Sequence, residues 1–409
     1  MEIDWKEVSN YVRTLPKNVD YLLVIQILPL LVISSILVKE INPALFHKQL
    51  IYYTVGAIGF FFALLIPWKK ILWWVAPLSY VLNLLLLLAV DVAGKSILGA
   101  RRWLQIPGTG LTIQPSEFIK VSVILMLAYL IYKKPPPEDG YGFLDFFKLS
   151  LVIVIPFLLI AKEPDLGTAM VLVMTGFGVL FIVGVKWRVW LTMFAVIALS
   201  APILYSHLHD YQKKRIQDFL GKPSYHVQQS LIAIGSGGLK GKAKEEATQT
   251  QLKFLPIASS DFIFAYLGER FGYRGMLTVI VLYILLIIHL LALSQIYSQD
   301  YLIKAVSAGL AFLIFIYMDV NMYMIIGMAP VVGVPLPMFS HGGTSFIIFA
   351  IFFGILLNLI AFKNYFQYNS DAKITMLEKE ALKKNEELER RRRNLQSLKM
   401  RKNNDNKGL

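Results

Sequence analysis

The feature that most constrains this chain is a series of uninterrupted apolar runs that recurs along most of its 409 residues. Runs of about 17–25 apolar residues match the thickness of a bilayer's hydrocarbon core, and in lipid a helix satisfies its own backbone hydrogen bonds. Hydrophobic residues make up 56% of the chain and charged residues 17%, whereas a soluble domain carries about 25% charge. The sequence therefore predicts an all-α polytopic integral membrane protein.

We predict ten transmembrane helices from this pattern. Their expected positions are 20–38, 49–66, 71–90, 116–132, 147–162, 166–185, 189–206, 274–293, 301–325 and 343–361. No small-residue cleavage site follows the first run, which we interpret as a retained span. An even number of spans puts both termini on one side of the membrane. Because the turns Lys69-Lys70 and Lys133-Lys134 and the basic tail fall on that side, the positive-inside rule makes it cytoplasmic.

The predicted organisation has three parts: a cytoplasmic leader at 1–19, a ten-span membrane domain at 20–361, and a basic cytoplasmic tail at 362–409. Two unusual loops, 91–115 and 207–273, fall on the outer side. The second is too long for a plain connector. We expect short amphipathic helices in it, lying at the outer surface.

The charge balance and the absence of cysteine limit the classes of partner. The formal net charge is +14, and part of the excess lies in the tail. Anionic lipid of the cytoplasmic leaflet is therefore the expected partner, rather than nucleic acid. With no cysteine in the chain, disulfides and thiolate metal sites are excluded.

Four polar clusters fall on the outer side. The first contains Arg101, Arg102, Trp103, Gln114, Ser116, Glu117 and Lys120. Pro115 suits the first position of a helix, and Glu117 complements its positive end. Glu117 and Lys120 are three residues apart and share one helix face. They could bind a substrate, or form an ion pair that only helps the helix to pack.

The second and third clusters each have two interpretations. Asp165 could line a site or cap the sixth span. Asp261 lies in the apolar stretch 254–269 of the long loop, followed by Glu269, and a carboxylate beside a bilayer is costly to keep. It could carry chemistry. Alternatively, Ser259 or Ser260 could cap a helix and leave Asp261 in its first turn.

The fourth cluster is Ser340, His341, Gly342 and Gly343, preceded by paired prolines. It predicts a rigid turn whose backbone amides are free to meet an anion. The shared side of the four clusters is more informative than any one of them. Together they could line one cleft that suits a substrate with a phosphate head and a lipid tail, where basic groups hold the phosphate and a carboxylate takes a proton from a hydroxyl.

At these residues the chain is similar to a known family. The matching blocks are Gly99-Ala-Arg-Arg-Trp103, Gln114-Pro-Ser-Glu117 with Lys120, Pro164-Asp-Leu-Gly-Thr-Ala169, Ser224-Tyr-His-Val-Gln-Gln-Ser230, Thr248-Gln-Thr-Gln-Leu-Lys-Phe-Leu-Pro256 with Asp261-Phe-Ile-Phe264, and Gly333-Val-Pro-Leu-Pro337 with Ser340-His-Gly-Gly-Thr-Ser345. They resemble the shape, elongation, division and sporulation (SEDS) family, most closely its rod-shape (RodA) branch. The resemblance runs from the first span to about residue 361.

The resemblance implies a peptidoglycan glycosyltransferase that polymerises lipid II into glycan strands during cell elongation. It maps the family's essential aspartate onto Asp261, as the general base for an inverting transfer in which undecaprenyl pyrophosphate leaves. Arg102, Lys120 and Arg101 become candidates for pyrophosphate contact, with Glu117 orienting Lys120. The sequence defines no certain cofactor and no metal site, although a divalent ion, Mg²⁺ or Mn²⁺, could assist departure of a pyrophosphate.

The same resemblance implies partners: the nascent glycan strand, a class B penicillin-binding protein that crosslinks peptides, and other membrane proteins of the elongation machinery. The active site would face outward from the cell (inner) membrane. The chain departs from the family pattern at Ile257 to Ser260, where a glutamate and a histidine are replaced, at Arg270 and at His341. Two other functions stay open: a lipid II flippase and a non-catalytic membrane scaffold.

Overall fold

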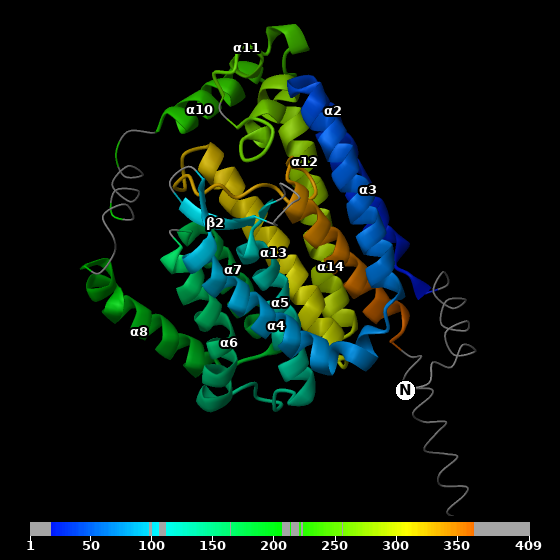
Figure 1. Ribbon diagram of the computed structural model, residues 1–409, viewed down its shortest axis with the longest axis vertical. Helices are drawn as coiled ribbons and strands as arrows, with labels where there is room; N and C mark the ends of the chain where they lie inside the picture. The colour runs from blue at the N-terminus through cyan, green and yellow to red at the C-terminus, as the bar shows by residue number, and fades with distance from the viewer. Residues whose placement is uncertain are drawn as a thin grey trace, which may run out of the picture. The chain divides into compact units, whose positions relative to one another are not determined.

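The computed structural model describes residues 18–97, 100–105, 112–163, 165–206, 213, 221, 224–255 and 257–363. The chain divides into two units, residues 1–360 and 361–409, and the arrangement described below is that of the first unit. Long apolar helices dominate it (Figure 1). The prediction of an all-α polytopic membrane protein is confirmed.

Nine helices in the described ranges are long and apolar enough to cross a membrane. They are α2 (Tyr21–Ile41), α3 (Pro43–Leu65), α4 (Trp68–Ala93), α5 (Pro115–Lys133), α6 (Phe143–Lys162), α7 (Leu166–Val183), α12 (Ile263–Ile296), α13 (Tyr301–Ile325) and α14 (Gly343–Ala361). The helix α8 (Trp187–Ser206) occupies the seventh predicted span, but its apolar stretch, Trp187–Ser200, is shorter. The count of ten spans stays a prediction.

Two helices begin well before the apolar runs that predict them. The second span is expected from 49, yet α3 starts at Pro43, because the Asn42 side chain accepts a hydrogen bond from the Ala44 amide at 2.9 Å and caps the helix. The eighth span is expected from 274, yet α12 starts at Ile263. Its first two turns are joined to the rest across Gly272, whose φ of 63° and ψ of −162° are not helical.

The loop at 91–115 contains a small sheet that the sequence pattern does not predict. Three short strands, β1 (Lys95–Ile97), β2 (Ala100–Gln105) and β3 (Thr112–Ile113), pair antiparallel in the order β1-β2-β3. Such short strands carry too little alternation for a period-2 signal. The strand β2 packs against α4 and α5, so the sheet lies where α5 begins.

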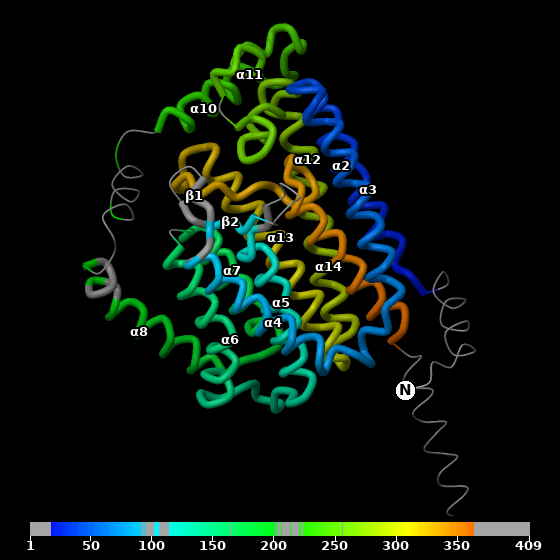
Figure 2. Tube along the Cα trace, viewed as in Figure 1, coloured from blue at the N-terminus to red at the C-terminus, as the bar shows by residue number. Residues whose placement is uncertain are grey.

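The described part of the long loop contains short helices. They are α10 (Tyr225–Gly237), the 3-10 turn η1 (Lys244–Glu246) and α11 (Thr248–Gln251). Figure 2 shows α10 and α11 at the same end of α12 as the end of α2. The glycine-rich run after α10 lies against the Gly272 break, where a Cβ atom would come within 2.5 Å of the Gly241 nitrogen. Only residues without a side chain allow this approach.

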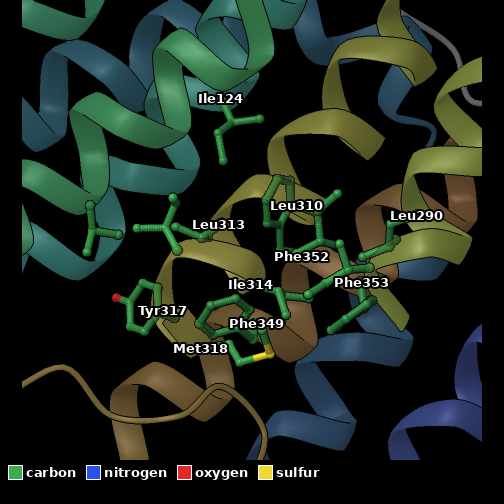
Figure 3. Packing of buried hydrophobic residues seen from close by; sticks show 14 of the residues in the cluster. Ile124, Leu290, Leu310, Leu313, Ile314, Tyr317, Met318, Phe349, Phe352 and Phe353 are labelled. Atoms are coloured by element: carbon green, nitrogen blue, oxygen red, sulfur yellow. The ribbon is translucent and has the colours of Figure 1, made fainter. Parts of the chain in front are cut away.

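The helix α13 lies at the centre of the packing. It contacts α5, α7 and α12, and most of its residues are buried. Aromatic and branched side chains from α5, α12, α13 and α14 interlock around it (Figure 3). By contrast, large apolar side chains on α2, α3 and α4 are exposed, as expected for surfaces that face lipid.

Candidate active site

The four polar clusters are joined in pairs by direct contacts at one end of the helices. We call this the site end; it is the end where α5 and α7 begin and where α13 finishes. The first cluster contacts the second, and the third contacts the fourth. Two side chains of α13 then link the pairs.

Asp165 joins the first cluster to the second. Its carboxylate lies 3.4 Å from an Arg102 nitrogen and 3.4 Å from the Gln114 amide nitrogen. It also accepts a hydrogen bond from the Thr168 amide at 3.3 Å, so its role as the cap of α7 is confirmed. Asp165 is only 2% exposed and Arg102 is 19% exposed. The guanidinium is therefore the more accessible partner. Gln114 also donates to the Ser116 hydroxyl at 3.1 Å.

Glu117 and Lys120 form an ion pair on the first turns of α5, as their spacing predicts. The Lys120 nitrogen lies 2.7 Å from a Glu117 oxygen and is only 3% exposed. The hydroxyl of Tyr317, on α13, contacts both groups and lies 3.1 Å from a Glu117 oxygen. Figure 3 shows this hydroxyl pointing away from the Phe349 ring. A buried lysine thus meets a carboxylate and a phenol, which satisfies its charge.

Asp261 lies in a turn before α12, not in the helix. The helix begins at Ile263, and no side chain caps it. The interpretation that Ser259 or Ser260 caps a helix and leaves Asp261 in its first turn is therefore wrong. The Ser260 hydroxyl instead donates to the Asp261 carboxylate at 3.2 Å. Burial raises the pKa of Asp261, and the Ser260 hydrogen bond offsets part of this effect.

The fourth cluster packs against this turn. The Ser340 hydroxyl donates to the Ser260 carbonyl at 2.7 Å, and the His341 amide donates to the Ser259 carbonyl at 2.9 Å. Burial, with nearby Lys48, lowers the pKa of His341, which keeps its imidazole neutral at neutral pH.

The rigid turn expected here is present, but four of its amides are already used. Those of 336, 339, 340 and 341 all donate within the protein, so they do not form an open anion site. Gly342 precedes α14, which begins at Gly343. A Cβ atom at Gly343 would lie 2.4 Å from the Tyr52 ring, so this glycine permits the close packing of α14 on α3.

Glu269 and Arg270 hold the first turns of α12. Glu269 is fully buried, and its oxygens accept from the Gln249 amide at 2.9 Å and the Thr250 hydroxyl at 3.0 Å. This favours an anchoring role over contact with substrate. Arg270 pairs with Glu40, at the end of α2, at 3.0 Å and donates to the Lys242 carbonyl at 2.7 Å.

Two further residues reach the site from α13. Tyr317 contacts the Glu117–Lys120 pair, and Asn321 donates to the main-chain oxygen of Asp261 at 2.8 Å. They are four residues apart, so they lie on one helix face, one turn apart. In the sequence, the only sign of these two residues is that both are polar side chains inside an apolar span.

Two further residues of the first cluster lie in β2. Trp103 is half-buried, and Arg101 pairs through its backbone with Ser96.

The residues that could hold a metal are dispersed. Within the ranges that the structure describes, no three His, Asp or Glu side chains lie close enough together to hold an ion. Those residues therefore offer no assembled set of ligands for Mg²⁺ or Mn²⁺. Chemically, the site end combines the half-buried carboxylate of Asp261, whose pKa is raised by burial, with the cationic side chains of Arg102 and Lys120.

Comparisons with known proteins give a consistent picture. The family model FTSW_RODA_SPOVE, described as a cell cycle protein, matches residues 13–365. The peptidoglycan glycosyltransferase MrdB of Helicobacter pylori is 51% identical over 352 residues, which are 86% of this chain and 92% of that protein. MrdB of Escherichia coli K12 is 41% identical over 295 residues, which are 69% of this chain and 77% of that protein.

Solved structures with a similar fold agree with these relatives. A chain from a peptidoglycan synthase complex, described as coordinating polymerization and crosslinking, superposes with a TM-score of 0.72 and 25% identity over 83% of this chain and 97% of that one. The rod shape determining protein RodA of Thermus thermophilus superposes with a TM-score of 0.63 and 26% identity over 84% of this chain and 97% of that one.

Proposed function

Because the chain belongs to the FtsW, RodA and SpoVE (SEDS) family, we propose that Asp261 is the general base of its glycosyl transfer reaction. The chain is a multi-pass membrane protein and a peptidoglycan glycosyltransferase of the elongation type, like the MrdB proteins that it matches over most of its length.

The proposed reaction joins two lipid II molecules or extends a glycan strand. The acceptor's GlcNAc 4-hydroxyl gives its proton to the Asp261 carboxylate, and its oxygen forms a bond to the anomeric carbon of the donor. The bond from that carbon to the phosphate oxygen breaks, and undecaprenyl pyrophosphate leaves with the electron pair. Attack opposite the leaving group inverts the anomeric configuration.

The observation that carries this proposal is the setting of Asp261. Its carboxylate is half-buried, lies outside any helix, and has a pKa raised by burial. A base works best when its pKa lies near the working pH, and a carboxylate in water titrates well below that, near 4. The turn at Asp261 therefore moves the carboxylate toward the range that a general base needs.

Arg102 is the better candidate of the two cations for binding the pyrophosphate. Its guanidinium is partly exposed, and one of its nitrogens lies 3.4 Å from a carboxylate oxygen of the buried Asp165, which fixes its position. A planar guanidinium can donate two parallel hydrogen bonds to a phosphate. Lys120 lies deeper and already contacts Glu117 and Tyr317. It would stabilise negative charge on the leaving group mainly through its field.

Orientation and partners belong to the same proposal. The positive-inside pattern favours cytoplasmic termini, with the site end facing outward. Because this chain resembles one in a complex that coordinates polymerization with crosslinking, its expected partner is a crosslinking enzyme, a class B penicillin-binding protein.

The test is polymerisation of lipid II by the purified full-length chain in detergent, where no transport can be scored. Asp261→Asn and Asp261→Ala should each lower the rate about 10²–10⁴-fold. Asp145→Asn, which changes a carboxylate paired with Lys134 at the other end of α5, is the matched control and should leave the rate unchanged.

Four outcomes decide among the alternatives. Glycan product that disappears in both Asp261 variants supports the proposal. Wild-type rates in both folded variants would overturn it. If the wild-type chain forms no glycan while moving lipid II across vesicles, it is a flippase; if Asp261→Ala restores cell shape to a strain that lacks this chain, it acts as a scaffold.

A further inference from the structure

Asn321 is a fully buried amide near the end of α13 that the proposed chemistry does not use. Its Nδ2 atom donates to two main-chain oxygens, that of Asp261 at 2.8 Å and that of Val334 at 2.7 Å. Only the nitrogen of the amide can donate to two carbonyl oxygens, so these contacts fix its orientation. Both of its hydrogens are therefore committed to these two loops.

The two loops that Asn321 joins close around the Asp261 carboxylate. One precedes α12 and carries Asp261; the other follows α13 and carries Gly333 and Val334. At Gly333 the backbone has a φ of +70°, and a Cβ atom there would lie 3.4 Å from an Asp261 oxygen. The loop backbone thus passes directly beside the carboxylate, and Asn321 holds the two loops together.

The base is also placed relative to the cations by this contact. Tyr317 touches the Glu117–Lys120 pair, and Asn321 touches Asp261 four residues later on the same face of α13. One turn of an α-helix rises about 5.4 Å and is stiff. A buried, rigid element therefore carries the contacts to both halves of the site.

We propose that Asn321 is a positioning residue for glycosyl transfer, because its amide holds the Asp261 backbone at a fixed place relative to the Glu117–Lys120 pair. The inference rests on the proposed role of Asp261 as the base. Asn321 does not touch the reacting atoms. A misplacement of about 1 Å at a reacting group can lower a rate about 10²-fold, and loss of these two hydrogen bonds frees the turn to move.

The chain offers a matched control in Asn358 of α14. It is also buried, and its Nδ2 atom donates to a main-chain oxygen, that of Leu64, at 2.6 Å. That contact joins α14 to α3 and involves none of the site residues named above. Replacing either asparagine by leucine keeps a similar size and removes the donor. Only the change at Asn321 is expected to alter the transfer step.

The experiment measures kcat and KM for lipid II polymerisation by full-length Asn321→Leu, Asn321→Ser and Asn358→Leu, with thermal unfolding in detergent as a folding check. We expect kcat to fall about 10²-fold in Asn321→Leu with KM nearly unchanged. Asn321→Ser keeps one short donor and is less disruptive to packing, so its kcat should fall less than that of Asn321→Leu. Asn358→Leu should keep wild-type kcat.

Each result has one meaning for the inference. A folded Asn321→Leu or Asn321→Ser protein with wild-type kcat overturns it, as does a change in KM alone. An equal loss in Asn358→Leu also overturns it, because general loosening of the core would then explain the effect. Asp261→Asn run in parallel separates the two proposals: if that variant is active, the role of Asp261 fails first; if it is inactive while the Asn321 variants are not, only the positioning role fails.

Discussion

The two ends of α5 carry the same kinds of charge in opposite settings. At its first turns, Lys120 pairs with Glu117 and is 3% exposed. Directly after its last residue, Lys134 pairs with Asp145 and is 67% exposed. A pair in water costs little to form and contributes little, whereas a buried pair is expensive unless both partners stay in place. Burial of charge, rather than its presence, distinguishes the site end.

Other ion pairs among the described residues follow this division only in part. The Arg102–Asp165 and Arg270–Glu40 pairs at the site end are largely buried, while the Lys186–Asp139 pair is exposed. The Lys69–Asp300 and His289–Asp20 pairs are far from the site end and yet largely buried. There Asp300 also caps α13 by accepting from two amides, so its burial has a structural cause.

The largest expected effect follows from removing one partner of the buried pair. Lys120→Met leaves Glu117 without its cation and should lower the free energy of unfolding by about 3–5 kcal/mol. Chemical denaturation in detergent measures it. The double variant Glu117→Gln with Lys120→Met removes both charges and should recover much of the loss. If Lys120→Met is as stable as the wild type, the contrast between the ends of α5 is wrong.

A smaller effect on stability is expected at the Arg270–Glu40 ion pair, which joins α12 to α2. Arg270→Ala removes the paired contacts to Glu40 and the hydrogen bond to the Lys242 carbonyl. It should lower the free energy of unfolding by about 1.5–3 kcal/mol. Arg274→Ala, four residues later and exposed, is the control. Equal unfolding free energies for the two variants would show that the Arg270–Glu40 pair contributes nothing to stability.

The next change, Asp261→Asn, should raise the stability of the fold instead of lowering it. Burial raises the pKa of Asp261, so the folded protein holds this proton more tightly than the unfolded chain. The ionised carboxylate therefore costs stability. The cost is absent below the unfolded pKa, grows as pH rises from the unfolded to the folded pKa, and is constant above it. Asp261→Asn should melt at a higher temperature than the wild type at neutral pH, by a margin that shrinks in acid.

Activity should follow the same titration in the wild-type chain. A base must be ionised, so the rate should fall as pH drops through the raised pKa of Asp261, at a higher pH than for an ordinary carboxylate. A pH profile of polymerisation measures this. A rate that stays constant down to the range of solvated aspartates would contradict the burial argument.

The smallest effect is expected at the exposed end of α5. Lys134→Met breaks a pair that water already screens, and should change the free energy of unfolding by about 0.2–1 kcal/mol. Polymerisation should be unaffected. A loss comparable with that of Lys120→Met would remove the distinction between the two ends.

Hydropathy was sufficient to predict the helical membrane fold, because span length is set by the bilayer. It could not place the start of α3 or α12, where the cap at Asn42 and the break at Gly272 decide. Hydropathy also does not predict the strands between residues 95 and 113, since they are short and depend on pairing with each other.

The site was predictable where neighbours in sequence are neighbours in space. The Glu117–Lys120 pair and the cap at Asp165 follow from spacing alone. Tyr317 and Asn321 do not, because inside an apolar span only tertiary packing reveals what a polar side chain meets. The anchoring of Glu269 by α11 depends in the same way on how a long loop folds back.

The spacing of Tyr317 and Asn321 on α13 has a consequence for how the chain can change in length. Each residue inserted into a helix turns everything beyond it by about 100° and shifts it by about 1.5 Å. A single insertion or deletion between these two positions would swing one contact off the site while the other stayed. A change of length outside the helices does not carry this penalty, so lineages of this protein should show gaps in loops and none within residues 317–321.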